Sequence, residues 1–147
     1  MRVSDVFRST NKIIQVDGRA ALRVAIRLMR EHNVGALLVR SDGTCSTRLL
    51  SERDVIDALA ARGSAVLEEY VDNVVPAGCI SCRPDDPIHH VMREMTQHRV
   101  RHLPVQDGSD VVGILSIGDI IKAQLDTMSL ENRILREEVI LKQAGKC

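Results

Sequence analysis

Aromatic residues are nearly missing from this sequence, which has one Phe, one Tyr and no Trp among 147 residues. It therefore lacks the aromatic platforms on which single-stranded nucleic acid stacks. Charge of one sign is missing too, because 20 Lys and Arg balance 20 Asp and Glu. No global basic field exists to attract nucleic acid or an anionic membrane. We therefore expect neither as a partner.

Long hydrophobic runs are also absent. The run at residues 34–39 is far short of the roughly 20 apolar residues of a membrane span. Residues 1–5 contain no apolar core that would make them a signal peptide. These features predict a cytoplasmic protein. In that compartment its four cysteines would be reduced thiols rather than a disulfide framework.

The sequence does contain an internal repeat, which is the first feature to seek in a new sequence. With a shift of 66 residues, Arg27, Met29, His32 and Val34 coincide with Arg93, Met95, His98 and Val100. With a shift of 65, Leu50, Ser51, Asp54 and Ile56 coincide with Leu115, Ser116, Asp119 and Ile121. We interpret the chain as two copies of one unit, 1–68 and 69–128, followed by a helical tail over 129–147.

Each copy has the pattern of a β-α-β-β-α unit. Apolar residues at helical spacing predict one helix per copy, namely Ala21, Leu22, Ala25, Ile26 and Met29, and then Ile88, Val91, Met92 and Met95. Short apolar strands follow at 35–39 and 102–105, each before an Asp-Gly turn. A unit of about 60 residues buries too little surface to be stable alone. We therefore expect a mixed α/β (α+β) fold in which the two units stack through their sheets.

A Ser-x-x-Asp motif recurs where a strand ends and a helix begins, at Ser51–Asp54 and Ser116–Asp119. One interpretation is a capping box, in which the Ser side chain accepts the backbone N–H of the Asp and the Asp side chain accepts the backbone N–H of the Ser. The other is a ligand site, because free N–H groups at a helix N-terminus attract phosphate. A short carboxylate beside them could accept both hydroxyls of a ribose. The two roles are compatible.

Two basic groups, Arg101 and His102, begin the strand of the second copy and could clamp a phosphate. The alternative is a solvated strand edge, which Pro104 favours. The first copy has the uncharged Gly35 and Ala36 at the equivalent places. The two copies are therefore not equivalent.

The Met-x-x-His-x-Val helix end, the Arg-His-Leu-Pro-Val strand and the Gly113–Asp119 ending resemble tandem cystathionine-β-synthase (CBS) domains over residues 3 to about 125. The resemblance implies a stand-alone Bateman module, a pseudo-twofold pair of β-α-β-β-α units. Such modules bind AMP, ADP, ATP, NAD or S-adenosylmethionine in clefts between the paired sheets. They act as regulatory sensors and usually not as enzymes. No other cofactor is implied, and the output would pass to an unknown effector protein.

The resemblance also assigns site residues. In the second copy Asp119 would bind ribose, Ser116 would lie near phosphate, and Arg101 and His102 would contact phosphate. The adenine would be lined by backbone groups of Ile80, Ser81 and Cys82. In the first copy the matching residues are Ser51, Asp54, Ile14, Gln15 and Val16. The second copy has the complete Gly-x-x-Ser-x-x-Asp sequence and the two basic residues Arg101 and His102, so we expect it to bind more tightly than the first. Asp119→Ala would then cost more affinity than Asp54→Ala.

The first copy departs from the family pattern at Arg48, which stands where the second copy has Gly113. A side chain there would either crowd the ligand or add a cation for its phosphate. Arg53 and Lys122 are further cations near the helix starts, and either could simply be solvated.

Two rival functions are open at this point. A metal- or redox-responsive protein would use Cys79 and Cys82 with the nearby His89, His90, His98 and His102. Cys-x-x-Cys is only half a zinc site, and on a strand its two side chains would point to opposite faces. An enzyme is less favoured, because the sequence contains no nucleophile elbow, Walker loop or dinucleotide fingerprint.

A homodimer is expected for two reasons. CBS pairs commonly join through their helices, and the end of the chain carries apolar residues at spacings of 4, 3, 4, 3 and 4, namely Ile121, Leu125, Met128, Asn132, Leu135 and Val139. That is a coiled-coil seam with Asn at an a position, which favours a registered parallel pair. Alternatively, the tail packs on its own module, or Ser129 caps a new helix and interrupts the seam.

Overall fold

The computed structural model describes residues 1–7, 13–42, 47–78 and 80–145. Within them lie α1 (Val3–Val6), α2 (Leu22–His32), α3 (Glu52–Arg62), α4 (Ile88–His98), α5 (Ile117–Ala144), and the 3-10 helices η1 (Ser64–Glu68) and η2 (Val71–Asn73). The apolar periodicity predicts α2 and α4, and both form. Each ends at a left-handed residue, Asn33 with φ 52° and Arg99 with φ 53°, which are equivalent in the repeat.

The strands confirm the mixed α/β prediction. In the first copy β1 (Gln15–Asp17) pairs in parallel with β2 (Ala36–Arg40), and β2 pairs antiparallel with β3 (Arg48–Ser51). In the second copy β4 (His102–Asp107) and β5 (Asp110–Ser116) form an antiparallel hairpin. Its turn contains Gly108 at φ 65°, as the Asp-Gly signal predicts.

The strand predicted around residues 80–82 is reduced to a single bridge between Cys82 and Val105. Cys82 N–H donates to the carbonyl of Pro104 at 3.0 Å, and Gln106 N–H donates to the carbonyl of Cys82 at 2.8 Å. Directly afterwards the chain turns, with Asp86 N–H bonded to the carbonyl of Arg83 at 3.1 Å. Pro84 has no N–H to donate, so the ladder cannot extend past this point.

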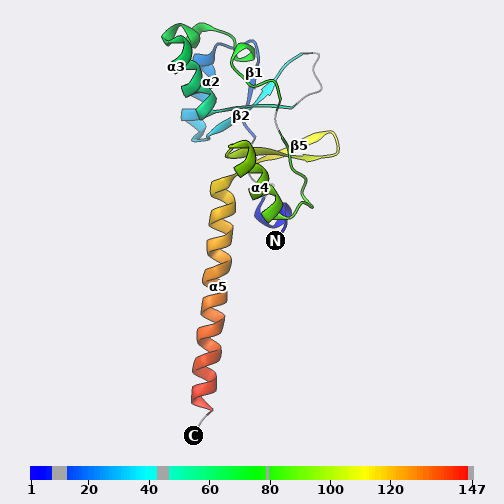
Figure 1. The fold of residues 1–147 in the computed structure, drawn as a ribbon, viewed down its shortest axis with the longest axis vertical. Coiled ribbons are helices and arrows are strands. Elements are labelled where there is room, and N and C mark those ends of the chain that lie inside the picture. The colour runs from blue at the N-terminus through cyan, green and yellow to red at the C-terminus, as the bar shows by residue number, and fades with distance from the viewer. Residues whose placement is uncertain (8–12, 43–46, 79, 146–147) are drawn as a thin grey trace.

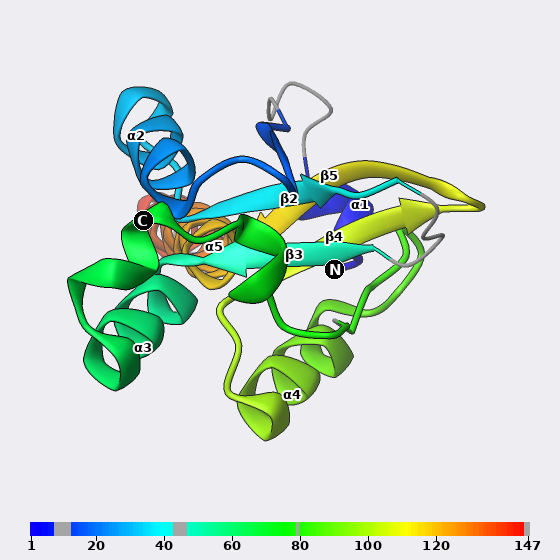
Figure 2. The same cartoon turned by 90° about the horizontal axis from the view of Figure 1, so that it is seen from above.

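The two sheets lie against each other, with β3 next to β4 (Figures 1 and 2). Gln106 Nε2 donates to Thr47 Oγ1 at 2.6 Å and ties the copies together. Apolar side chains of α2 and α3 form one buried cluster with the first sheet, and those of α4 and the start of α5 form a second with the other sheet. This arrangement is the predicted stacking of two units.

The short segment before each copy packs into the core of the other copy. Val3 and Val6 of α1 are buried with the side chains of α4 and β5, and Val3 N–H donates to the carbonyl of Asp86 at 2.9 Å. Val71 of η2 is buried in the first core, and its N–H donates to the carbonyl of Ala20 at 2.9 Å. The repeat boundary at 68/69 stays a prediction, but the packing crosses it in both directions.

Helix α5 continues without a break from Ile117 to Ala144 and crosses the predicted boundary at 128/129. The prediction that Ser129 starts a new helix is wrong, because the backbone there stays helical. The alternative that the tail packs on its own module is also wrong, since α5 extends away from the body and residues 125–145 are all exposed (Figure 1). None of the described helices combines the length and apolarity that a bilayer crossing requires.

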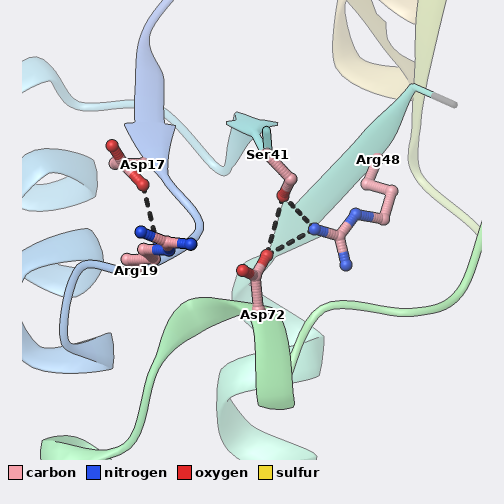
Figure 3. Close-up of polar contacts among 5 residues, drawn as sticks. All are labelled: Asp17, Arg19, Ser41, Arg48 and Asp72. Atoms are coloured by element: carbon pink, nitrogen blue, oxygen red, sulfur yellow. Dashed lines mark hydrogen bonds and ion pairs between the residues drawn. The ribbon is translucent and has the colours of Figure 1, made fainter. Parts of the chain in front are cut away.

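Arg48, for which the sequence offers two roles toward a ligand, forms an ion pair within the protein. Its guanidinium pairs with the carboxylate of Asp72, and both contact Ser41 Oγ, which donates to Asp72 at 2.8 Å (Figure 3). The hydrogen bond from Ser41 and the nearby Arg48 charge lower the pKa of Asp72, against the opposing effect of burial. In the second copy the equivalent Gly113 instead accommodates the ring of Phe7, which a Cβ at that position would overlap.

Removal of Asp72 is expected to destabilise the fold. The Arg48 side chain is only 14% exposed, so Asp72→Ala leaves a largely buried guanidinium without its carboxylate. We expect a loss of about 1–3 kcal/mol in unfolding free energy, measured by urea denaturation. The double variant Arg48→Leu with Asp72→Ala should recover most of it, because neither charge is then left alone. Identical urea midpoints for wild type and Asp72→Ala would show that the pair is only a surface contact.

Candidate functional site

Both Ser-x-x-Asp motifs form capping boxes, as one interpretation predicts. At α3 the carboxylate Oδ2 of Asp54 accepts the Ser51 N–H at 2.8 Å and the Ser51 hydroxyl at 2.9 Å. At α5 the Ser116 N–H donates to Asp119 Oδ2 at 3.1 Å, and Ser116 Oγ accepts the Asp119 N–H at 3.1 Å. Since these bonds use one carboxylate oxygen, Oδ1 of each aspartate is the atom that remains for a ligand.

A cleft of about 710 Å³ lies between the two copies. Ser51 and Asp54, at the N-terminus of α3, line it from the first copy. Ile80, Arg101 and His102 line it from the second copy. The structure therefore brings five of the twelve predicted site residues into one cleft of a size that suits a small-molecule ligand.

The other seven predicted residues are not among those that line this cleft, namely Ser116, Asp119, Ser81, Cys82, Ile14, Gln15 and Val16. Ile14 and Val16 are buried in the first core, and the Ile14 carbonyl accepts the Leu38 N–H at 3.0 Å. The Ser81 hydroxyl donates to Gln106 at 3.2 Å. Both backbone groups of Cys82 are used by β4, so they are not available to line an adenine.

The cleft brings the Ser51–Asp54 motif of the first copy together with Arg101 and His102 of the second. The sequence instead predicts that each ligand site is built from residues of a single copy. The end of β3 lies beside the start of β4, so Asp54 shares a cleft with Arg101 and His102. The imidazole of His102 also lies against Gly35, since a Cβ at Gly35 would be 3.0 Å from its Cε1 and Nε2 atoms. The uncharged start of β2 is thus what allows the cation-bearing start of β4 to approach the first copy.

His102 is a half-buried group between carboxylates. Burial lowers its pKa below the ordinary value, because it disfavours the charged imidazolium. The charges of Glu52 and Asp119 oppose this effect, and Arg101 adds to it. The imidazole is therefore neutral near pH 7, and an anion close to it would favour protonation.

Two further arginines line the cleft besides Arg101. Arg53, for which the sequence left open a role at the ligand or simple solvation, lines the cleft from α3. Its Nη1 donates to the Arg99 carbonyl at 3.4 Å. Arg99 also lines the cleft, but it is not among the site residues predicted from the sequence. The one signal that could have found it is its equivalence in the repeat to Asn33, the residue that ends α2. Lys122 is exposed on α5 and does not line the cleft.

Cys82 does not suit a metal or redox site. It is 2% exposed, and its thiol contacts the Pro104 carbonyl at 3.7 Å. Burial, with a smaller effect of the Asp86 charge, raises the pKa of this thiol to about 12, so the reactive thiolate is suppressed. Cys79 lies outside the described residues. Among those that are described, no three His, Cys, Asp or Glu side chains gather as metal ligands.

Comparison with known proteins agrees with the fold. The family model for the CBS domain matches twice, at residues 3–61 and 71–126. The CBS domain-containing protein YhcV of Bacillus subtilis is 29% identical over 120 residues, which are 82% of this chain and 84% of that protein.

Two solved structures illustrate the structural likeness. The CBS-domain protein ATU1752 of Agrobacterium tumefaciens has a TM-score of 0.77 at 27% identity, over 84% of this chain and 92% of that one. The CBS domain protein PAE2072 of Pyrobaculum aerophilum, solved in complex with AMP, has a TM-score of 0.70 at 24% identity, over 81% and 89% of the two chains. With two matched copies stacked through their sheets, this chain belongs to the CBS domain family.

Proposed function

We propose that this protein is a non-catalytic regulatory module that binds a phosphate-bearing adenosine compound in the cleft between its two copies. The observation that carries the proposal is the joint presence of Asp54, Arg101 and His102 in that cleft. A carboxylate for ribose hydroxyls then shares the cleft with a guanidinium for phosphate and with an imidazole that a nearby phosphate would protonate.

Each lining group has a role in this proposal. Asp54 Oδ1 would accept the ribose hydroxyls at the positive end of the α3 dipole. Arg53, Arg99 and Arg101 would neutralise phosphate oxygens through charge-assisted hydrogen bonds. Leu49, Ile80 and Val100 would provide apolar surface for the base. The carboxylates of Glu52 and Asp57 also line the cleft, so its net charge does not reject a cation. We favour AMP, ADP, ATP or NAD over S-adenosylmethionine because they carry the phosphate groups that arginines bind and it does not.

The cleft chemistry supports binding more than catalysis. The Ser51 hydroxyl already donates to Asp54 and accepts its N–H, so it serves the helix cap rather than acting as an activated nucleophile. AMP bound to PAE2072 is consistent with the proposal, although that likeness concerns the fold. We place the module in the cytoplasm, where such nucleotides report on metabolic state, with a protein effector as its output.

Because Asp54 lines the cleft and Asp119 does not, we now expect Asp54→Ala to cost more affinity than Asp119→Ala, the opposite of the order that the sequence predicts. Asp54→Ala removes the carboxylate that shares the cleft with the arginines, so we expect a loss of about 1.5–3 kcal/mol, roughly tenfold or more in affinity. Asp119→Ala makes the same change at the cap of α5 outside this cleft, and because the Asp119 charge acts on the pKa of His102 we expect it to cause a smaller loss rather than none. Calorimetry with AMP, ADP, ATP, NAD and S-adenosylmethionine measures both. Equal affinity in wild type and Asp54→Ala would refute the assignment.

Affinity is also expected to depend on pH through His102. Its pKa is lowered in the free protein, and a phosphate nearby would raise it, so binding takes up a proton. Binding should then tighten as the pH falls from 8 to 6, by at most about tenfold per pH unit. His102→Gln should lose this component. The ratio of the two affinities at each pH cancels the titration of the ligand itself, and a constant ratio would contradict the role.

A further inference from the structure

Helix α5 carries most of the large apolar side chains that the described part of the molecule exposes. They are Ile121, Leu125, Met128, Leu130, Ile134, Leu135, Val139, Ile140 and Leu141, each between 47% and 71% exposed. The 28-residue helix is about 42 Å long, and most of that length lies beyond the body (Figure 1). Seen from above in Figure 2, it extends behind the body as a single unaccompanied helix. Apolar surface of this extent marks an interaction site.

Five of these apolar residues and the polar Asn132 form one continuous row, here called the α5 stripe: Ile121, Leu125, Met128, Asn132, Leu135 and Val139. Because α5 is unbroken, these residues occupy successive d and a positions of a heptad on one face. The opposite face has a weaker row in which Leu130, Ile134 and Leu141 are interrupted by Glu137. The α5 stripe is therefore the better coiled-coil seam.

The charges beside the stripe indicate what covers it. Glu131 and Glu138 occupy g positions on one edge, and Arg136 occupies an e position on the other. In a parallel pair of identical helices, the g residue of one copy faces the e residue of the next heptad in the other, so Glu131 meets Arg136 of the second copy twice. In an antiparallel pair g faces g, and acidic edges would meet.

Two further observations fit the same partner. Within the described part of the chain neither Glu131 nor Arg136 forms an ion pair in its own molecule. Asn132 lies at an a position, where in a parallel pair it meets Asn132 of the second copy and fixes the register. An isolated helix with this much exposed apolar surface gains its stability from such packing rather than from propensity.

We propose that two copies of this chain pair through their α5 stripes as a parallel coiled coil, with Asn132 against Asn132 and Glu131 against Arg136. The pairing places both bodies at the same end of the coil. It is independent of the nucleotide cleft, so it holds whether or not the cleft binds a ligand.

Sedimentation equilibrium of the full chain tests the pairing. Wild type should be a dimer, and Leu135→Glu should weaken it at least about a hundredfold, because both copies lose a buried leucine. Leu141→Glu is the matched control: it makes the same change at an exposed leucine of the opposite face and should leave the dimer intact. A monomeric wild type, or equal losses in the two variants, would overturn the proposal.

Charge exchange and cross-linking test the orientation. Arg136→Glu should weaken the dimer about fivefold or more, and adding Glu131→Arg in the same chain should restore it. With Cys45, Cys79 and Cys147 replaced by Ser, Leu135→Cys should form a disulfide between the two copies on mild oxidation, since d positions face each other in a parallel pair. Failure of the double variant to recover, or absence of the disulfide in a dimer, would overturn the parallel arrangement.

Discussion

The docking of the two sheets against each other is the interaction on which the cleft depends. Each wall of the cleft comes from a different copy, with the start of α3 on one side and the start of β4 on the other. All the carboxylates of the lining come from the first copy, whereas Arg99, Arg101 and His102 come from the second. The close approach rests on a small feature, the bare backbone of Gly35 under the His102 imidazole. A Cβ at that position would lie 3.0 Å from the ring, so the imidazole would have to shift by a few tenths of an ångström.

At two places where the two copies differ in sequence, the residue in contact with the difference also differs. Where the second copy has Arg101 and His102, the first has Gly35 and Ala36, and the His102 ring lies against Gly35. Where the second copy has Gly113 beneath Phe7, the first has Arg48 paired with Asp72. In each case a change in one element is matched by its neighbour, so the pair of copies is the unit that packs.

Local patterns were sufficient for the helix caps and for α2 and α4, but not for the segment at 80–82, which forms only a single bridge. The Ser-x-x-Asp spacing predicted both caps because a capping box depends only on residues three apart. Apolar periodicity predicted α2 and α4 for the same reason. The grouping of Asp54 with Arg101 could not be predicted in this way. It depends on how the sheets of the two copies dock, and a local pattern contains no information about docking. The partner of Arg48 was missed because Asp72 lies 24 residues away in a linker that carries no motif.

Because short segments pack into the core of the opposite copy, α1 and η2 reach their packing sites at different stages of synthesis. Helix α1 is synthesised before the other described elements, yet the side chains that bury Val3 extend to Ile120 in α5. Since folding follows synthesis from the N-terminus, α1 has no site to occupy until almost the entire second copy has been made. The first copy, by contrast, is complete once η2 has emerged. Until the second copy is complete, Val3 and Val6 lack the side chains that bury them in the finished protein.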